Sequence, residues 1–429
     1  MALVASVALM ASAAPAYALQ PLETFVAAGR TKAPDNQEAK ASRDVLDGQH
    51  DVAVGRVLPG VSAQATYTRN QYDSQIQLPA EAGQQPVTVT ITPIDQLDAF
   101  VAVSVPLVNL SNFWQIKAAR IAREAGDLTV LATQLAIEAQ VTQDYYQLVA
   151  NMALVAESDR ALDVAKQSMA LTQAQFKAGS VAELDVDRAS NEVERNVQQV
   201  ASAQLQVVLS AQALETVTGV KADITQIVII EDDLHPEPAI TEFQPAEQQI
   251  PSVAAAIKNR ESADVAADAQ RLTLVPSLQG TFTERFTNAS GFSGNDASWQ
   301  AVLSLTWAFD WSTIGGIRVQ DANARVIAAR ENRARLAAND AIVRTWSTVS
   351  SSITRSRSAR VQVKSANHAS QLAMERYRVG ATTQLELLQA QRDAFTAEVS
   401  RIQADADLVN ARLQLRIAAG RDPLNPQTK

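Results

Sequence analysis

Apolar and polar residues alternate strictly in two regions of the chain. The first region contains Val61–Tyr67 and a longer alternation that begins at Val87 and runs to Leu107. The second contains Leu278–Phe286 and an apolar residue at every other position from Trp299 to Trp311. A period of two predicts β-strands with one apolar and one polar face. We therefore expect two β-hairpins, four strands in all, each closed by a polar loop.

Long helical patterns follow each predicted hairpin, and they are almost free of proline and glycine. A helix of about 65 residues is about 100 Å long at 1.5 Å per residue, so such helices must lie side by side as rods. Gly219 and Gly420 suit the position just after a helix C-terminus. The predicted helices cover approximately Asn112–Lys177, Glu183–Thr218, Pro251–Leu272, Gly316–Arg378 and Thr383–Ala418.

One apolar stripe in the second helix repeats with a mean period of 3.5 residues, which is the coiled-coil repeat. It predicts a seam along which this helix packs against its neighbours. The stripe consists of Val186, Val193, Val197, Val200, Val207, Ala211 and Leu214.

The order strand, strand, long helix, shorter helix occurs twice, so the chain is a tandem repeat. Phe176-Lys-Ala-Gly179 and Tyr377-Arg-Val-Gly380 lie 201 residues apart, and so do Asp185 and Glu386. The same spacing holds from Phe176 to Gly219 without insertion or deletion. A proline-rich, acidic segment separates the halves. We expect a signal peptide at 1–18, repeats at 19–219 and 251–420, a connector at 220–250 and a tail at 421–429.

The N-terminus is an apolar run that ends in Ala16-Tyr17-Ala18, the small-x-small pattern of a signal-peptidase site. This pattern predicts export, with the mature chain beginning near Leu19. The alternative is an ordinary buried helix. No later apolar stretch approaches the roughly 20 residues of a membrane-spanning helix.

Composition and charge exclude several functions. The net charge of −9 and the absence of a basic run argue against nucleic-acid binding. The absence of cysteine excludes disulfides and thiolate catalysis. His50, His235 and His368 lack the spacing of a zinc site or a catalytic triad, and no phosphate loop occurs. Glu231–His235 could hold a cation, but its composition favours a solvated linker. We expect no enzyme activity, cofactor or metal.

The predicted strands suit a lipid bilayer. Trp299 at one end of its strand and Trp307 and Trp311 at the other resemble the aromatic girdles of membrane barrels. Four strands cannot close a barrel, and an open sheet edge is not tolerated in lipid. Several chains must therefore share one barrel; two would supply eight strands and three would supply twelve. The alternative is a soluble helical stalk with a small β cap.

The sequence resembles the outer-membrane efflux protein (TolC) family. The resemblance rests on the duplicated plan and on a paired motif, which stands here as FKAGSVAELDVDRA and YRVGATTQLELLQA. It covers essentially the whole mature chain. It implies a mainly α fold with a β part: a homotrimer with a shared 12-stranded transmembrane β-barrel in the outer membrane and a coiled-coil tunnel of long α-hairpins in the periplasm. Such proteins are passive exit ducts for efflux or type I secretion. Their partners are a periplasmic adaptor and an inner-membrane transporter.

The resemblance also implies roles for residues at the hairpin tips. Gly179 and Gly380 would form the tip turns that receive the adaptor. Glu386 would contribute to an acidic ring that constricts the tunnel, and Asp185 would hydrogen-bond to Tyr377 to hold it shut. The family often has a second acid where this chain has Gln389, which weakens the ring. The alternative for both acids is a favourable position near a helix N-terminus.

The runner-up function is a soluble periplasmic adaptor or a structural coiled-coil protein without a pore. An adaptor should show a membrane anchor and β segments flanking one hairpin, whereas this chain has two equivalent halves. The cargo and the partner pump stay open.

Overall fold

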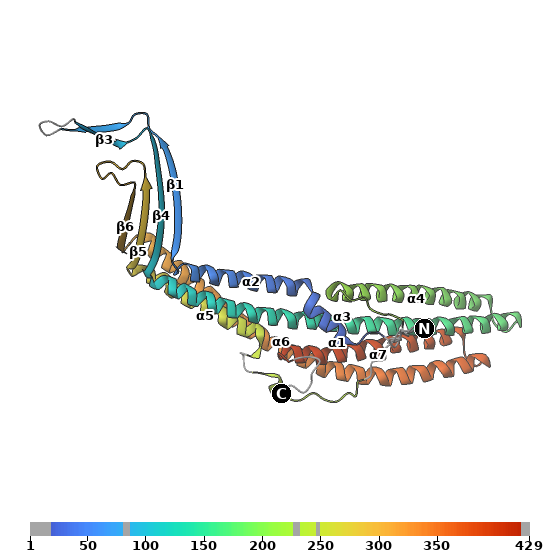
Figure 1. Ribbon diagram of the computed structural model, residues 1–429. Helices are drawn as coiled ribbons and strands as arrows, with labels where there is room; N and C mark the ends of the chain where they lie inside the picture. The colour runs from blue at the N-terminus through green and yellow to red at the C-terminus, as the bar shows by residue number, and fades with distance from the viewer. Residues whose placement is uncertain (1–18, 80–85, 226–231, 246–248, 422–429) are drawn as a thin grey trace, which may run out of the picture. The chain divides into compact units, whose positions relative to one another are not determined.

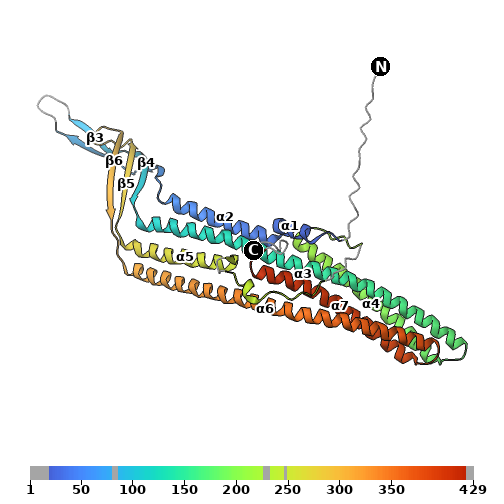
Figure 2. The ribbon, with the colours of Figure 1, turned by 90° about the horizontal axis from the view of Figure 1, so that it is seen from below.

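The computed structural model describes residues 19–79, 86–225, 232–245 and 249–421. The expected signal peptide and most of the tail, together with Glu231, therefore lie outside the described residues. The chain divides into two compact units. The helical unit comprises the described parts of Met1–Lys40, Val130–Pro251 and Arg335–Lys429, and the sheet unit comprises Ala41–Thr129 and Ser252–Ala334. Figures 1 and 2 show the elements from two directions.

The sheet unit contains a four-stranded antiparallel sheet in the order β1-β4-β5-β6 (Figure 1). Strands β4 and β5 join the two repeats at the centre, so β1 and β6 are the edges. The strands are β1 (Gly60–Arg69), β4 (Asp95–Val108), β5 (Ser277–Thr287) and β6 (Ala297–Thr306).

The register places the apolar residues of all four strands on one face. Val61 pairs with Val103, Val103 with Phe282, and Phe282 with Ala301. The opposite face is polar, and there Arg285 forms an ion pair of 2.7 Å with Asp98. The two-faced strands predicted from the alternation are therefore confirmed. The apolar face also carries two carboxylates: Glu284, which pairs with Val101 and with Trp299, and Asp95 at the end of β4, which pairs with Arg69.

The first hairpin differs from its prediction, because the alternation from Val87 to Leu107 is not one strand. It contains β3 (Val87–Thr92) and β4, separated at Pro93. Proline has no backbone N–H to continue a ladder, and the side chain of Asn70 donates to the Pro93 carbonyl at 2.9 Å. Strand β3 pairs instead with β2 (Ser74–Leu78) in a separate two-stranded ribbon.

The last predicted strand is shorter than its alternating pattern. Strand β6 ends at Thr306, and α6 (Trp311–Arg378) begins at Trp311. Asp310 explains the change, because its carboxylate accepts a hydrogen bond of 2.9 Å from the backbone N–H of Thr313. This is an N-terminal cap, which satisfies a helix donor. Trp307 and Trp311 therefore lie outside the strand in which they were predicted.

Four helical segments complete the sheet unit: most of α2 (Pro34–Gly55), the start of α3 (Leu110–Lys177), α5 (Pro251–Arg271) and the start of α6. Ion pairs join them. Arg43 Nε lies 2.9 Å from Asp127, and Lys258 Nζ lies 2.9 Å from Glu124. Among the described helices, none combines the length and apolar character needed to cross a membrane.

The helical unit contains α1 (Leu22–Lys32), the rest of α3 and α6, α4 (Glu183–Thr218) and α7 (Gln384–Ala418). One core joins α1 to α3 and α4, with Phe25, Leu148 and Leu214 fully buried. A second joins α6 to α7 around Val349, Leu408 and Leu415. Each such side chain contributes about 1.5–3 kcal/mol by leaving water. The long helices agree with their predicted ranges, which rest on the near absence of proline and glycine, except that α6 begins at Trp311 and not near Gly316.

The buried seam of α4 coincides only in part with the predicted valine stripe. Val207 and Leu214 are buried as predicted, but Val197 is 43% exposed. Small and polar side chains fill the rest of the buried face, which periodicity of apolar residues cannot reveal. The buried residues of α4 are Ala189, Glu192, Asn196, Ala203, Val207, Ser210, Leu214 and Thr218.

Candidate functional site

Both helical hairpins of the helical unit reverse at a glycine. Gly179 has φ +70° and Gly380 has φ +73°. At the first tip the N–H of Gly179 donates to Phe176 O (2.8 Å) and that of Ser180 to Gln175 O (3.0 Å); Gly380 and Ala381 repeat the pattern. These paired bonds form a Schellman motif, which requires a left-handed residue. A Cβ would meet no neighbouring atom at either glycine. Backbone conformation alone therefore demands glycine at both tips.

The helix after the second tip begins with a capping box. The N–H of Glu386 donates to Thr383 Oγ1 at 3.3 Å, and the N–H of Thr383 donates to Glu386 Oε2 at 3.1 Å. The hydroxyl of Thr382 also donates to Glu386 Oε2. These donors, with Thr382 first, lower the pKa of Glu386. Glu386 is thus an exposed, ionised cap at a helix N-terminus, and its part in an acidic ring stays a prediction.

The first tip has no equivalent cap. Its N-cap residue is Ala182, whose side chain offers no acceptor. Asp185, the counterpart of Glu386, instead lies 3.3 Å from Arg188 Nη1, one turn along α4. The two tips therefore share their turn but differ in the partners of their acids.

Tyr377 lies buried between the two hairpins and is 3% exposed. Its hydroxyl lies 3.0 Å from Thr172 Oγ1 on α3, and Thr172 Oγ1 lies 3.2 Å from Gln384 Oε1 on α7. Gln175 donates to the Tyr377 carbonyl at 3.2 Å. Burial, and to a smaller extent the charge of Asp185, raises the pKa of the Tyr377 hydroxyl.

In the structure Asp185 pairs with Arg188 and the Tyr377 hydroxyl with Thr172, and not with each other as expected. Thr172, which packs directly against the phenol, provides the nearer partner. Tyr377 therefore joins α6 to α3 and α7 near the tips.

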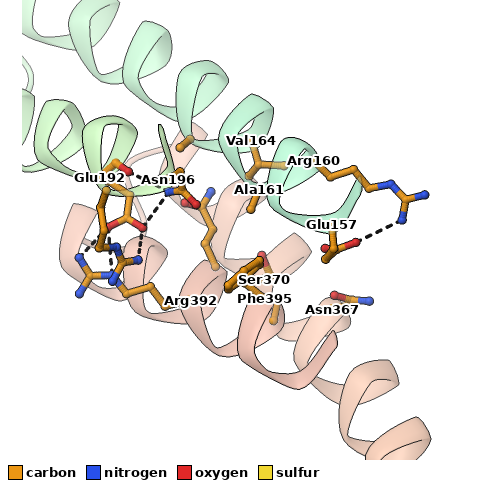
Figure 3. A pocket seen from close by; sticks show the side chains of 14 residues that line it. Glu157, Arg160, Ala161, Val164, Glu192, Asn196, Asn367, Ser370, Arg392 and Phe395 are labelled. Carbon is orange, nitrogen blue, oxygen red and sulfur yellow. Dashed lines mark hydrogen bonds and ion pairs between the residues drawn. The ribbon is translucent and has the colours of Figure 1, made fainter. Parts of the chain in front are cut away.

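A buried ion pair links α4 to α7 above the tips. Glu192 is 4% exposed, and its Oε2 lies 2.6 Å from Arg392 Nη2 and 3.0 Å from Arg392 Nε. Arg195 also binds Glu192, and Asn196 donates to its other carboxylate oxygen at 3.3 Å. Figure 3 shows Arg392 and Asn196 beside the carboxylate of Glu192. A buried charge is stable only when it is paired in this way.

Glu192 borders a cavity of about 130 Å³ between the two hairpins. Figure 3 shows that side chains from all four long helices line it. Glu157 of α3 is among them, and burial, followed by the charge of Glu398, raises its pKa. Both guanidinium and carboxylate side chains line the cavity, so its lining has no uniform charge.

The described part of the connector packs against α6 and α7, which corrects its interpretation as a solvated linker. Phe243 is 5% exposed in the core of these helices. Arg412, also buried, forms ion pairs with Asp232 (2.9 Å) and Glu237, and its Nη1 lies 2.9 Å from His235 Nε2. Asp232, Asp233 and His235 are close enough to hold a cation. The guanidinium of Arg412 already supplies that positive charge.

The three tryptophans predicted at a membrane interface are all exposed on the sheet unit. Trp299 is 67% exposed on β6, and its ring stacks on Phe282 with centroids 6.1 Å apart. Trp307 is 66% exposed and donates through Nε1 to Leu274 O at 3.0 Å. Trp311 is 81% exposed at the start of α6. Their placement at a lipid interface stays a prediction.

Sequence reasoning missed Glu192, Arg392 and the Arg412 cluster. One signal for Glu192 existed, because it lies three residues after Ala189 and four before Asn196, on the helical face that proves to be buried. No local signal points to Arg392 or Arg412, since their partners lie 200 and 175–180 residues away.

Comparisons with known proteins agree with this architecture. The chain matches the family described as outer membrane efflux protein over residues 30–220 and 243–421. OprJ, an outer membrane protein of Pseudomonas aeruginosa, is 26% identical over 393 residues, covering 85% of this chain and 76% of OprJ.

Two solved structures share the fold. The outer-membrane channel OprN superposes with a TM-score of 0.80 and 21% identity, covering 94% of this chain and 91% of OprN. The CmeC outer membrane channel of Campylobacter jejuni gives a TM-score of 0.80 and 16% identity, covering 94% and 86%. These relatives are channels rather than enzymes. The chain therefore belongs to the outer membrane efflux protein family, and it is an outer-membrane channel-tunnel for efflux.

Proposed function

We propose that three copies of this chain form one passive exit duct, to which each contributes one four-stranded sheet of a 12-stranded barrel. The observation that supports this is the sheet itself, whose edge strands β1 and β6 have no partner on their outer sides among the described residues. An unpaired edge is not tolerated in lipid. Pairing β1 of one copy with β6 of the next removes every edge.

The duct supplies no energy and no chemistry of its own. An inner-membrane transporter drives the cargo, and a periplasmic adaptor docks at the hairpin tips around Gly179 and Gly380. The tips support this role because each presents a tight, exposed turn. Whether the assembly serves drug efflux, metal efflux or type I secretion depends on the transporter. Family membership disfavours the runner-up, a soluble adaptor or coiled-coil protein without a pore.

Assembly is tested by the mass of the mature protein after extraction. We expect the protein to fractionate with outer membranes, to require detergent, and to have a trimer's mass by light scattering corrected for detergent. A protein that is soluble and monomeric without detergent would rule out the shared barrel.

The gate is a separate part of the proposal. We infer that Glu386 contributes to the ring that constricts the tunnel and that Tyr377 keeps the tip closed. In planar bilayers we expect Glu386→Ala, which removes both charge and cap, to raise the resting conductance. Glu386→Gln separates the two effects, because an amide oxygen still accepts from Thr383 while the charge is lost. If Glu386→Gln conducts like the parent while Glu386→Ala does not, the residue acts as a cap only.

A further inference from the structure

Helices α4 and α6 of the helical unit each carry several apolar side chains that nothing in the described chain covers. On α4 these are Val197 (43% exposed), Leu205 (55%), Val208 (58%) and Leu209 (53%). On α6 they are Leu336 (64%), Val343 (40%), Val361 (64%) and Leu372 (41%). The neighbouring α7 exposes only Leu385 among its large apolar residues. In the helical unit α3 exposes three such residues, Leu131, Val164 and Phe176, so α4 and α6 together carry most of the uncovered apolar surface of the long helices.

The two surfaces have opposite charge. Helix α4 contains six acidic and two basic residues, whereas the part of α6 from 335 to 378 contains two acidic and eight basic residues. Several of these charges have no side-chain partner within the described chain. On α4 the unpartnered acids are Glu183, Asp187, Glu194 and Glu215; on α6 the unpartnered bases include Arg357, Lys364 and Arg378.

On α6, the exposed bases form a column along the helix. The buried seam follows a seven-residue repeat through Ile342, Val349, Ser356 and Tyr377. The residue that follows each position of this repeat lies on one neighbouring face of the helix. That face carries Arg357, Lys364 and Arg378. On α4, Asp187 and Glu194 are likewise one heptad apart. Each helix therefore presents a stripe of one sign.

We propose that the α4 face of one protomer docks against the α6 face of the next, with Glu194 opposite Lys364 and Val197 opposite Val361. This proposal rests on the trimer proposed above and names its interface. Because α4 and α6 lie in the same unit, each copy offers both faces. A head-to-tail contact of this kind repeats around a ring until it closes.

Symmetry determines which residues can meet. In a closed ring the copies are related by rotation alone, so residues in contact lie at the same height along the tunnel. The hydrogen bonds of Tyr377 and Gln175 place the tips of both hairpins together. Glu194 lies 15 residues after Gly179, and Lys364 lies 16 residues before Gly380. Val197 and Val361 lie 18 and 19 residues from the same glycines.

A difference of one residue is about 1.5 Å along a helix, so both pairs are level. Within each helix the charged and the apolar residue are three positions apart, which places them on one face. An apolar contact flanked by an ion pair is the usual composition of a helix interface. Because α4 runs away from the tip and α6 runs toward it, the pairing is antiparallel.

The absence of cysteine from the chain makes disulfide trapping a direct test. In Glu194→Cys/Lys364→Cys, mild oxidation should convert the monomer band on a non-reducing gel into covalent dimers and trimers, and reductant should reverse this. The matched control is Glu194→Cys/Arg357→Cys. Arg357 lies on the same column but one heptad, about 10 Å, farther from the tip, beyond the roughly 7 Å Cα separation that a disulfide spans. The control should remain monomeric on the gel.

The outcomes separate the interface from the trimer itself, because the detergent mass is measured on the same variants. If the detergent mass is that of a trimer, three results with the 194/364 variant would overturn the proposed interface and leave the trimer intact. These results are no covalent multimers, a cross-link only within one chain, or cross-linking no stronger than in the 194/357 control. A monomeric mass overturns both proposals. If an acidic or basic partner protein covers these faces instead, the purified trimer will not cross-link.

Discussion

At the scale of the residue, equivalent positions of the two repeats have different partners. Glu386 closes a capping box at the second tip, whereas Asp185 forms an ion pair with Arg188 at the first. The difference arises from one neighbour: Thr383 offers a hydroxyl at the N-cap, and its counterpart Ala182 offers none. A duplicated motif therefore does not duplicate the chemistry of its side chains.

Tyr377 provides the test at this scale. Tyr377→Phe removes the hydrogen bond with Thr172 but keeps the ring, so we expect a loss of about 1 kcal/mol in unfolding free energy. If this bond keeps the tip closed, the resting conductance in planar bilayers should rise as well. The control is Tyr72→Phe at an exposed tyrosine (74%), where neither quantity should change. Unchanged conductance in Tyr377→Phe would exclude a gating role.

The same residue predicts a dependence on alkaline pH. Burial raises the pKa of Tyr377 above its ordinary value of 10.0, so the folded protein favours the neutral phenol. Its contribution to stability is then fully present below pH 10 and is lost as the pH rises through the folded pKa. In Tyr377→Phe this alkaline loss should be smaller, which a series of unfolding measurements at increasing pH would show.

At the scale of the element, the hairpins depend on two glycines whose requirement is conformational. A left-handed conformation costs a residue with a Cβ about 1–2 kcal/mol. Because open space surrounds both glycines, no steric clash adds to this cost. The reversals are thus determined by backbone geometry and not by packing.

We expect Gly179→Ala and Gly380→Ala each to lower the free energy of unfolding by about 1 kcal/mol, and Gly380→Asn to lower it less because asparagine tolerates this conformation. The matched control is Gly48→Ala. Gly48 lies within α2, and a Cβ there would also meet no neighbour, but its helical backbone should make alanine stabilising by about 0.5–1 kcal/mol. Denaturant titration in detergent measures all four variants. Equal effects at the tips and at Gly48 would contradict the explanation.

At the scale of the whole molecule, function depends on surfaces that one chain leaves uncovered. The sheet has an apolar face and two unpartnered edges, and α4 and α6 expose apolar stripes. A soluble monomer rarely exposes so much apolar surface. Lipid and neighbouring copies are the partners that these surfaces fit.

Tryptophan fluorescence tests the contact with lipid. Of the five tryptophans, Trp299 lies on the apolar face of β6 and Trp346 lies in the helical unit, donating to Pro238 O at 3.0 Å. We expect bromine-labelled lipid to quench a variant that retains only Trp299 and to leave a variant that retains only Trp346 almost unchanged. Similar quenching of both would contradict the assignment of β6 to the membrane.

Local patterns predicted much of the fold because they report on single elements. A period of two identified the faces of the strands, the near absence of proline and glycine identified the long helices, and Gly179 and Gly380 identified the turns. The errors occurred where a neighbouring group decides the outcome. Pro93 with Asn70 separates β3 from β4, and the cap at Asp310 takes Trp311 into a helix.

The sequence by itself determined the duplicated architecture, the family and the positions of the hairpin tips, because these follow from spacing along the chain. Tertiary structure alone decided the partners of charged groups far apart in sequence: Glu192 with Arg392, Arg412 with Asp232 and Glu237, and Tyr377 with Thr172. The reason is physical. Periodicity records which face of a helix avoids water, but a buried charge or hydroxyl is satisfied by whichever group the packing of other helices brings within about 3 Å.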